Sequence, residues 1–326
     1  MSRPSVCIVT PALAAANNGN WQTASRWARM LRSHYRVELL GEWHGEPANA
    51  MIALHALRSA DSIARWSQAP RRGPLVVALT GTDLYRDILV DARAQRSLTL
   101  ADRLVVLHER AVDDLPPAHR AKAVACFQST PARAPAAKTA RHLRVVMVGH
   151  LREEKAPQTY FEAARRLAGR EDIRLDHIGA ALDPAFGREA LALQQACPGY
   201  RWLGALPHEA TRRHIQRAHA LVHTSRIEGG AHVVMEAICS GTPVLATRIS
   251  GNVGMLGRDY AGYFEPGDGA GLATLLERCR NVPAILRALR EQCAARAPLF
   301  EPAREQAGLL DLVHELLNDL PLEKHP

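Results

Sequence analysis

The sequence of 326 residues has no long apolar run, and this excludes an integral membrane protein. No run approaches the roughly 20 apolar residues that a helix needs to cross a bilayer. The first residues lead directly into a predicted strand, 5–10, without the apolar region of a cleavable signal. We therefore expect a cytoplasmic protein with no membrane partner.

Cysteine is scarce and carries no metal-binding pattern. The six cysteines form no C-x-x-C pair and lie scattered in apolar segments, which favours reduced, buried thiols over disulfide bonds or zinc. They are Cys7, Cys126, Cys197, Cys239, Cys279 and Cys293. We expect no metal. The first strand is not followed by G-x-G-x-x-G, so a dinucleotide is unsupported and we expect no cofactor.

Aromatic residues are also few, at 5% of the chain, although the net charge is +8. A basic chain can bind nucleic acid, but the arginines are spread along predicted helices and lack interleaved aromatic side chains. We expect no nucleic-acid partner. A positive field that attracts small phosphorylated substrates explains the charge more economically.

Short apolar runs alternate with helical stretches, and this predicts an α/β fold with parallel sheets covered on both faces. A stretch rich in proline and alanine, 128–141, interrupts the alternation and predicts a linker. The chain then divides into domains 1–127 and 142–300 and a C-terminal helical segment, 301–326, that we expect to pack across the domains. Helices important for the site are predicted at 23–34, 87–100 and 231–239.

One segment, residues 223–247, combines a strand, a loop, a helix and a second strand. Gly229 and Gly230 remove side chains where the loop enters the helix, so an anion could approach unpaired N–H groups at a positive helix end. Glu228 and Glu236 flank this position, and a carboxylate can accept two neighbouring sugar hydroxyls. The alternative is a solvated glutamate and a capping residue in an ordinary βαβ unit.

The two glutamates, followed by A-I-C-S-G-T-P-V-L-A-T, resemble the paired-glutamate signature of the GT-B nucleotide-sugar glycosyltransferases, glycosyltransferase family 4. The resemblance implies two facing Rossmann-like domains with a cleft between them. It assigns acceptor binding to the first domain and nucleotide-sugar binding to the second. It also implies that the transfer needs no metal. Glu228 would be catalytic, and the donor would contact Gly229, Gly230, His232, Val233 and Glu236.

The segment G-H-L-R-E-E-K resembles the family's G-R-L-x-x-x-K, whose arginine and lysine neutralise the departing diphosphate. Lys155 matches the lysine, and we expect it to be catalytic. His150 stands where the family has arginine, so we assign His150 to donor binding and expect Arg152 to supply the missing catalytic charge. The alternative is a βα loop with helix-capping acids and a solvated lysine.

The same resemblance implies further donor contacts in two loops. Gly19 and Asn20 lie in the loop after the first strand, where the family places a glycine against the donor diphosphate. Gly19 and its asparagine neighbours could equally form an ordinary turn. Gly179 ends a later strand, at a position where the family commonly holds the nucleobase through backbone contacts.

Polar residues at the ends of strands in the first domain are the candidates for acceptor binding. They are Asn18, His55, Arg58, Thr82, Asp83 and Arg86. Many relatives carry H-G-T-D where this chain has T-G-T-D, so Thr80 replaces a histidine that contacts the sugar. Loss of that imidazole argues against an ordinary alcohol acceptor. The alternative role for Asp83 is to cap the following helix.

The stretches A-N-N-G-N-W-Q-T-A, L-H-A-L-R-S-A-D-S-I, L-T-G-T-D-L-Y-R-D and V-G-H-L-R-E-E-K resemble the selenosugar synthases of selenoneine biosynthesis, a branch of this group. The resemblance implies that a UDP-sugar, UDP-N-acetylglucosamine or UDP-glucose, reacts with selenophosphate to form an anomeric carbon–selenium bond with release of UDP and phosphate. It also implies functional links to a selenophosphate-producing enzyme and to a downstream selenoneine-forming enzyme.

The chemistry of selenophosphate agrees with the loss of the histidine. Selenophosphate is already an anionic, soft nucleophile, so it needs a cationic site more than a general base, and Arg58, Arg86 or Arg152 could provide one. Two other functions stay open. One is hexose transfer to a hydroxyl of a carbohydrate or lipid, and the other is a non-catalytic nucleotide-sugar binding module. Retention of Lys155 and both glutamates argues against the latter.

Overall fold

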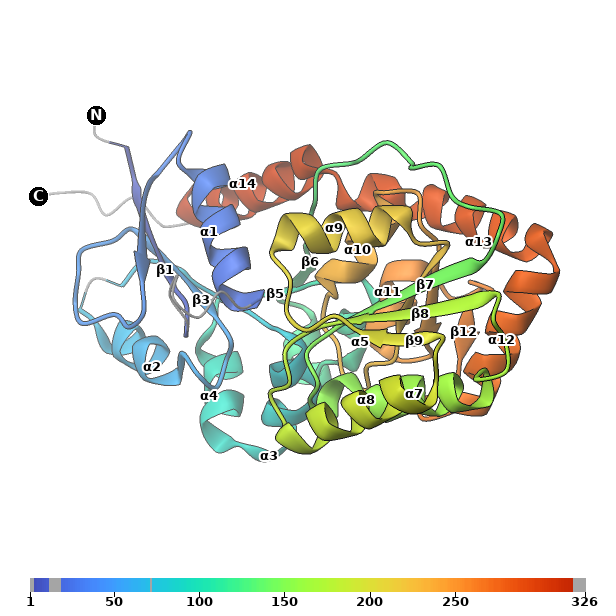
Figure 1. Ribbon diagram of the computed structural model, residues 1–326. Coiled ribbons are helices and arrows are strands. Elements are labelled where there is room, and N and C mark those ends of the chain that lie inside the picture. The colour runs from blue at the N-terminus through green and yellow to red at the C-terminus, as the bar shows by residue number, and fades with distance from the viewer. Residues whose placement is uncertain (1–2, 12–18, 71, 319–326) are drawn as a thin grey trace, which may run out of the picture. The chain divides into compact units, whose positions relative to one another are not determined.

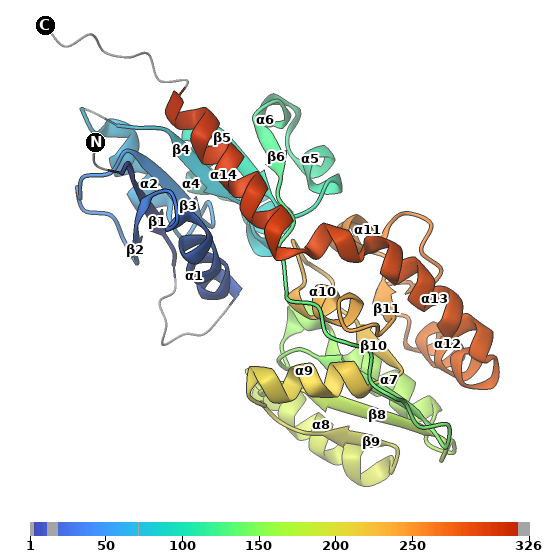
Figure 2. The same ribbon diagram turned by 90° about the horizontal axis from the view of Figure 1, so that it is seen from above.

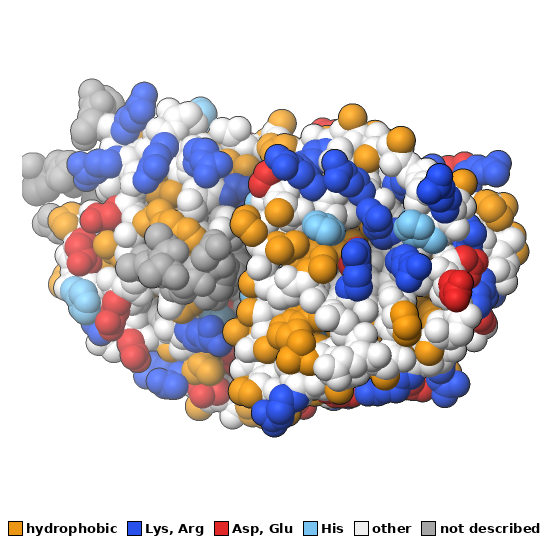
Figure 3. Space-filling view, in the orientation of Figure 1, with side chains coloured by type: hydrophobic (Ala, Val, Ile, Leu, Met, Phe, Trp, Pro, Cys, Tyr) orange, Lys and Arg blue, Asp and Glu red, His pale blue; other side chains and the backbone are white. Residues whose placement is uncertain are grey.

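The computed structural model describes residues 3–11, 19–70 and 72–318 (Figure 1). The chain divides into two compact units. Unit 1 comprises Met1–Ser129 and Pro302–Pro326, and unit 2 comprises Thr130–Glu301. Lys and Arg side chains lie over both units on the face drawn in Figure 3, with Asp and Glu side chains between them.

Unit 1 is built on a six-stranded parallel sheet with the order β2-β1-β3-β4-β5-β6. The strands are β1 (Ser5–Val9), β2 (Arg36–Leu40), β3 (Ala50–Leu54), β4 (Leu75–Ala78), β5 (Arg103–Val106) and β6 (Ala123–Ala125). Its helices are α1 (Gly19–Leu31), α2 (Ala60–Gln68), the π-helical turn η2 (Asp83–Asp87), α3 (Ile88–Val90), α4 (Ala92–Leu100), α5 (Arg110–Asp114), α6 (Pro117–Arg120) and α14 (Pro302–Asn318). β1, β3 and β4 are short runs that are buried throughout, as expected for strands covered on both faces.

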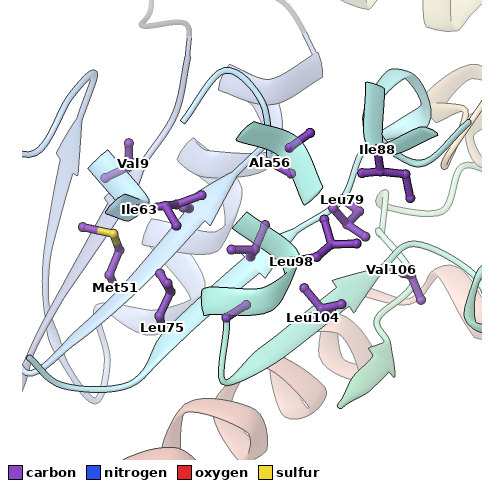
Figure 4. Packing of buried hydrophobic residues seen from close by; sticks show 14 of the residues in the cluster. Val9, Met51, Ala56, Ile63, Leu75, Leu79, Ile88, Leu98, Leu104 and Val106 are labelled. Atoms are coloured by element: carbon purple, nitrogen blue, oxygen red, sulfur yellow. The ribbon is translucent and has the colours of Figure 1, made fainter. Parts of the chain in front are cut away.

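Alternate residues of β1 belong to the two cores of unit 1, because successive side chains of a strand point to opposite faces. Cys7 and Val9 pack with residues of α2 and α4, including Ile63 and Leu98, as Figure 4 shows in part. Val6 and Ile8 pack with residues of α1 and α14 on the other face. Both faces of the sheet are therefore covered.

The last helix, α14, packs on unit 1 beside α1 (Figure 2). Its apolar face is formed by Leu309, Leu312, Val313 and Leu316. Burial of each large apolar side chain contributes about 1.5–3 kcal/mol. The chain therefore leaves unit 1 after Ser129, forms unit 2, and returns at Pro302 to complete the first unit.

Unit 2 contains a second six-stranded parallel sheet, with the order β12-β11-β10-β7-β8-β9. Its strands are β7 (Leu143–Val148), β8 (Ile173–Ile178), β9 (Tyr200–Trp202), β10 (Ala220–His223), β11 (Val244–Thr247) and β12 (Tyr263–Phe264). Its helices are η3 (Glu153–Lys155), α7 (Pro157–Arg166), α8 (Pro184–Ala196), α9 (His208–Arg217), α10 (His232–Ile238), α11 (Ser250–Leu256), α12 (Gly269–Asn281), α13 (Pro283–Arg296) and η4 (Ala297–Phe300). The two parallel sheets with their helices confirm the predicted α/β class.

Three helices near the site differ from their predicted ranges. The helix predicted at 23–34 is α1, Gly19–Leu31, so residues 19 and 20 lie in its first turn instead of in a loop. The helix predicted at 87–100 is broken at Asp91, whose side chain accepts a hydrogen bond of 2.8 Å from the backbone N of Arg93 and caps α4. The helix predicted at 231–239 is the shorter α10, His232–Ile238.

Candidate functional site

Glu228 lies between β10 and α10, where three polar side chains approach its carboxylate. Oε1 of Glu228 pairs with Nζ of Lys155. It also accepts a hydrogen bond of 2.9 Å from Ser225 Oγ and lies 3.4 Å from Nε2 of His223. The structure thus brings the predicted catalytic residues Lys155 and Glu228 into direct contact.

The surroundings of Glu228 fix its charge. Burial by itself raises the pKa of this carboxyl group, but the charge of Lys155 and a hydrogen bond from His223 hold the pKa well below its ordinary value. Glu228 therefore stays ionised at neutral pH. It is suited to accept hydrogen bonds or to balance a positive charge, and unsuited to donate a proton.

Backbone contacts hold Lys155 and Glu228 in place. The hydroxyl of Thr224 donates a hydrogen bond of 2.6 Å to the carbonyl oxygen of Lys155. Gly251, in the first turn of α11, lies against the loop of Glu228. A Cβ atom added to Gly251 would lie 2.1 Å from the carbonyl oxygen of Glu228, so only glycine allows this approach. No sequence pattern indicated the roles of Ser225, His223 and Thr224.

A second group of predicted donor residues meets at the ends of β7 and β8. His150 Nδ1 accepts a hydrogen bond of 3.0 Å from the backbone N of Ala180, the residue after Gly179. Gly179 has a φ of 156°, and an added Cβ would lie 2.0 Å from the carbonyl oxygen of Gly149. Burial, followed by the charges of Arg152 and Lys155, lowers the pKa of His150, so this imidazole is neutral at pH 7.

Of the two predicted catalytic cations, Arg152 is held less firmly than Lys155. Its Nε lies 3.8 Å from Oε2 of Glu154, and almost half of the side chain is exposed. After burial, the charge of Arg152 contributes to the lowered pKa of His150, so the two side chains belong to one loop. Its contact with a substrate stays a prediction.

The residues at the start of α10 occupy the expected place. Gly229 and Gly230 precede the helix, and His232 and Val233 form its first turn and are partly exposed. The backbone N of Ala231, the residue that caps α10, is covered by Sδ of Met255 at 3.3 Å. An anion at this turn would therefore meet the neighbouring backbone groups, and its binding stays a prediction.

Glu236 follows in α10, where it is buried and contacts two basic side chains. Its Oε1 lies 2.6 Å from His208 Nε2 and 4.0 Å from Arg212 Nη1. Both partners belong to α9. Arg212 is itself held by Thr130 and by the carbonyl oxygen of Pro131. His208 and Arg212 are contacts that the sequence did not indicate.

Gly19 and Asn20 begin α1 in unit 1. The hydroxyl of Thr23 donates a hydrogen bond of 2.9 Å to the carbonyl oxygen of Gly19. A Cβ atom at Gly19 would meet no described atom within 4 Å, so packing among the described residues does not require glycine here. Asn18, an expected acceptor contact, lies outside the described residues.

The other acceptor candidates cluster after β3 and β4. Asp83 Oδ1 lies 2.6 Å from Nδ1 of His55, and its Oδ2 accepts backbone hydrogen bonds from Ala56 and Thr80. Asp83 makes no side-chain cap of a helix, so the capping alternative is wrong. His55 also approaches Thr82, with Nε2 3.2 Å from Oγ1. The loop of Thr80, where the resemblance implied a histidine in relatives, thus receives an imidazole from the residue that follows β3.

Two arginines flank this cluster. Arg58 is exposed and follows His55, and Arg86 Nε donates a hydrogen bond of 2.9 Å to Asp87 Oδ1. Asp87 Oδ2 also lies 3.7 Å from His55 Nε2. His55, Asp83 and Asp87 offer three potential metal-ligand atoms within 4.8 Å of one another, a cluster that the sequence prediction of no metal did not anticipate.

The model of a known family matches residues 128–297, which is just over half of the chain and includes Lys155, Glu228 and Glu236. The description of that family is "Glycosyl transferases group 1". The chain belongs to this family. The predicted GT-B resemblance is confirmed at the level of the group 1 family and fold.

A relative of this group 1 chain is "Glycosyltransferase 1 domain-containing protein 1" from Xenopus tropicalis, with 30% identity over 122 residues. The match covers 37% of this chain and 35% of the relative, so the chain spans only about a third of that protein's length. The relative therefore supports the family without identifying a substrate.

Solved structures share the fold at low identity. Sucrose-phosphate synthase from Thermosynechococcus elongatus is 15% identical, with a TM-score of 0.80 over 97% of this chain and 100% of that one. Anabaena HepE, in complex with UDP-glucose, is 14% identical, with a TM-score of 0.74 over 96% of this chain and 100% of that one. These likenesses establish the GT-B fold.

The structure also bears on the predictions for the cysteine thiols and for membrane-spanning segments. All six cysteines are unpaired and buried, as predicted, and burial raises the pKa of Cys7 and Cys126 to about 12. Among the described residues, no helix is both long enough and apolar enough to span a membrane.

The contact between Glu236 and His208 leads to a prediction for the group 1 chain. The hydrogen bond to Glu236 raises the pKa of His208 above its ordinary value, despite the opposing effect of burial. We expect NMR titration to give a raised pKa for His208 that falls back in Glu236→Gln. His314, on an exposed surface of α14, is the internal control. An unchanged pKa for His208 in the variant would contradict the contact.

Proposed function

We propose that this group 1 glycosyltransferase transfers a hexose from a UDP-sugar, UDP-N-acetylglucosamine or UDP-glucose, to selenophosphate. The products are a selenosugar with an anomeric carbon–selenium bond, UDP and phosphate. The observation that carries the transfer is the contact between Lys155 and Glu228. A fixed cation beside a fixed anion can stabilise the charges that separate when the diphosphate leaves the sugar.

The donor assignment rests on the residues around this ion pair. Lys155 and Arg152 supply positive charge for the departing diphosphate, and the loop of Gly229 and Gly230 gives it access to the backbone. Glu236 would exchange its contact with His208 for the ribose hydroxyls. Gly179 and His150 lie together at the next loop, where the nucleobase would bind. The HepE complex with UDP-glucose supports this class of donor.

The selenophosphate assignment rests on the sequence resemblance and on acceptor chemistry. An anionic, soft nucleophile needs positive charge more than deprotonation. Arg58 lies in the turn after β3 and Arg86 lies in η2, both next to the His55 cluster at the carboxyl ends of strands of unit 1, where α/β folds bind ligands. We propose that these arginines bind the phosphate of the acceptor.

A second acceptor class is favoured by one observation. The imidazole of His55 beside Asp83 is the kind of group that deprotonates an alcohol, so hexose transfer to a hydroxyl acceptor is the competing function. The test is UDP release by the full chain with product mass detection, using each donor with selenophosphate, thiophosphate, phosphate or simple sugars. A selenium-bearing hexose supports the proposal. Turnover only with hydroxyl acceptors, or donor binding without turnover, rejects it.

The proposed acceptor site predicts the effect of removing its arginines. Arg58→Ala and Arg86→Ala should each raise the KM for selenophosphate about 10- to 100-fold, because hydrogen bonds to charged groups contribute about 1.5–3 kcal/mol. The KM for the UDP-sugar should change little. Arg96→Ala, an exposed arginine of α4 in the same unit, is the matched control. Unchanged acceptor saturation in both variants would show that the site is wrong.

A further inference from the structure

His223 ends β10, a strand that is otherwise apolar and buried throughout. The imidazole is only 2% exposed, and its Nδ1 atom has no hydrogen-bond partner among the described residues. A buried polar atom without a partner costs free energy, and an apolar side chain would avoid that cost. The other ring nitrogen, Nε2, is therefore where a histidine at this position can have a role.

Two oxygen atoms lie next to Nε2, and together they decide whether it carries a proton. Ser225 Oγ is 3.2 Å away and Glu228 Oε1 is 3.4 Å away. The single hydrogen of the Ser225 hydroxyl is donated to Glu228 Oε1 at 2.9 Å, so this hydroxyl can only accept from the imidazole. An ionised carboxylate also only accepts. Both contacts therefore require a proton on Nε2.

The contacts of Glu228 all fall on one of its two oxygens. Oε1 meets Lys155 Nζ, Ser225 Oγ and His223 Nε2. In the described part of the chain no hydrogen bond reaches Oε2, and 13% of the Glu228 side chain is exposed. Because Oε1 is already occupied by three neighbours, a hydroxyl of a substrate is left with Oε2.

The three neighbours of Oε1 differ in how firmly they are held. Lys155 carries its charge on a flexible stem, and a serine hydroxyl can rotate about its bond. The backbone of Ser225 is fixed, since Thr247 Oγ1 donates a hydrogen bond of 2.6 Å to its carbonyl oxygen. The Nε2–H of the buried His223 then occupies a lone pair of Ser225 Oγ, which directs the hydroxyl hydrogen to Glu228.

We propose that His223 is a positioning residue for the glycosyl transfer, whose Nε2–H holds Ser225 and Oε1 of Glu228 so that Oε2 faces the transferred hexose. This rests on the proposed function, in which Glu228 acts while the sugar leaves the diphosphate, but not on the identity of the acceptor. His223 is buried and acts through Glu228. It forms no bond to the substrate and gives up no proton.

The first test compares two amides at position 223 by kcat for UDP release from the full chain. Glutamine is long enough to place its N–H near the position of Nε2, whereas asparagine reaches only as far as Nδ1. His223→Asn should lower kcat about 10- to 100-fold, the loss expected for one hydrogen bond to a charged group, and His223→Gln should stay within about threefold of wild type. His214→Asn, at a partly buried histidine of α9, is the matched control.

The second test asks whether His223 acts through Glu228. In the Glu228→Gln background, His223→Asn should cause no further loss of kcat, because residues that act as one unit are not additive. Urea unfolding of the same variants reports stability separately. An equal loss of kcat from His223→Asn in both backgrounds would overturn the proposal, and so would an equal loss in His223→Asn and His223→Gln.

A third measurement needs no variant at position 223 that folds. NMR of the wild-type chain with ¹⁵N-labelled histidine should show a proton on Nε2 of His223 at neutral pH, and a proton on Nδ1 alone would overturn the proposal. No UDP release from the wild type with any acceptor would reject the proposed function and this role with it. Turnover with hydroxyl acceptors alone would reject selenophosphate, and the position 223 variants would then be compared with that acceptor.

Discussion

Replacement of Glu228 by glutamine should reduce turnover about 10²- to 10³-fold, the loss typical when one electrostatic group of an active site is removed. Glutamine keeps the shape and can still accept a hydrogen bond from Ser225, but it carries no charge. Lys155 would then lose the anion that holds its ammonium. The measurement is kcat for UDP release, with donor affinity determined separately by calorimetry.

The control for Glu228→Gln is Glu277→Gln. Glu277 lies on α12 of the same unit and pairs with Arg170 at the surface, so the same chemical change there should leave kcat unaffected. Lys155→Met should cause a loss of the same order as Glu228→Gln. The double variant should lose less than the product of the two single losses, because the residues act as a pair. Wild-type kcat in Glu228→Gln would exclude this ion pair from catalysis.

Lys155 and Glu228 could each be assigned to the site from the sequence, because each residue carries its own local signal. Both follow strands of one parallel sheet, and β7 and β10 are neighbours in that sheet. Their carboxyl ends therefore lie at the same edge. The polar partners of Glu228, Ser225 and His223, carried no such signal, because a serine and a histidine at the end of a strand are common without function.

The cluster of unit 1 was predicted only in part. The sequence placed His55 and Asp83 at the ends of successive strands, and β3 and β4 do pair. It could not predict that the His55 ring would approach both Asp83 and Thr82, because its position depends on a left-handed φ at a residue that rarely adopts one. The loss of histidine at Thr80 therefore looked like the loss of the base, whereas an imidazole reaches the loop from another strand.

The break at Asp91, between α3 and α4, was also missed because it depends on a local side-chain contact. The sequence 87–100 has no proline or glycine, so an uninterrupted helix was the simplest prediction. In the structure Asp91 is extended, with a φ of −110°, and its carboxylate caps α4. Aspartate favours such a cap because its side chain competes with the helical backbone for hydrogen bonds. The side-chain cap at Asp91 thus interrupts the continuous helix that the sequence pattern predicted.

The C-terminal helix shows why an amphipathic pattern predicts burial but not the partner. The apolar stripe of α14 packs on unit 1, and at its start the buried carboxylate of Glu305 binds three neighbours. It accepts hydrogen bonds from Trp27 Nε1 at 2.7 Å, from Arg26 Nε at 2.8 Å and from the backbone N of Ser129 at 2.8 Å. Glu305 thus connects α1, α14 and the point where the chain leaves unit 1.

Removal of this carboxylate should destabilise unit 1 strongly. In Glu305→Ala the guanidinium of Arg26, the indole N–H of Trp27 and the N–H of Ser129 lose their common acceptor while remaining largely buried. Breaking a buried ion pair by removing one partner costs about 3–5 kcal/mol. We expect urea unfolding of the full chain, followed by tryptophan fluorescence, to show an earlier first transition, because two units need not unfold together.

Glu315→Ala on the same helix is the matched control. Glu315 is more than half exposed and pairs with Arg103 at 2.9 Å, so its loss should change the free energy of unfolding by about 1 kcal/mol or less. Glu305→Gln should fall between the two, because its amide oxygen still accepts hydrogen bonds but balances no charge. Equal effects at positions 305 and 315 would mean that the buried network contributes no more than a surface pair. A large effect only at 305 would make the returning helix an integral part of the first unit, so that unit 1 could not fold stably until the whole of unit 2 had been synthesised.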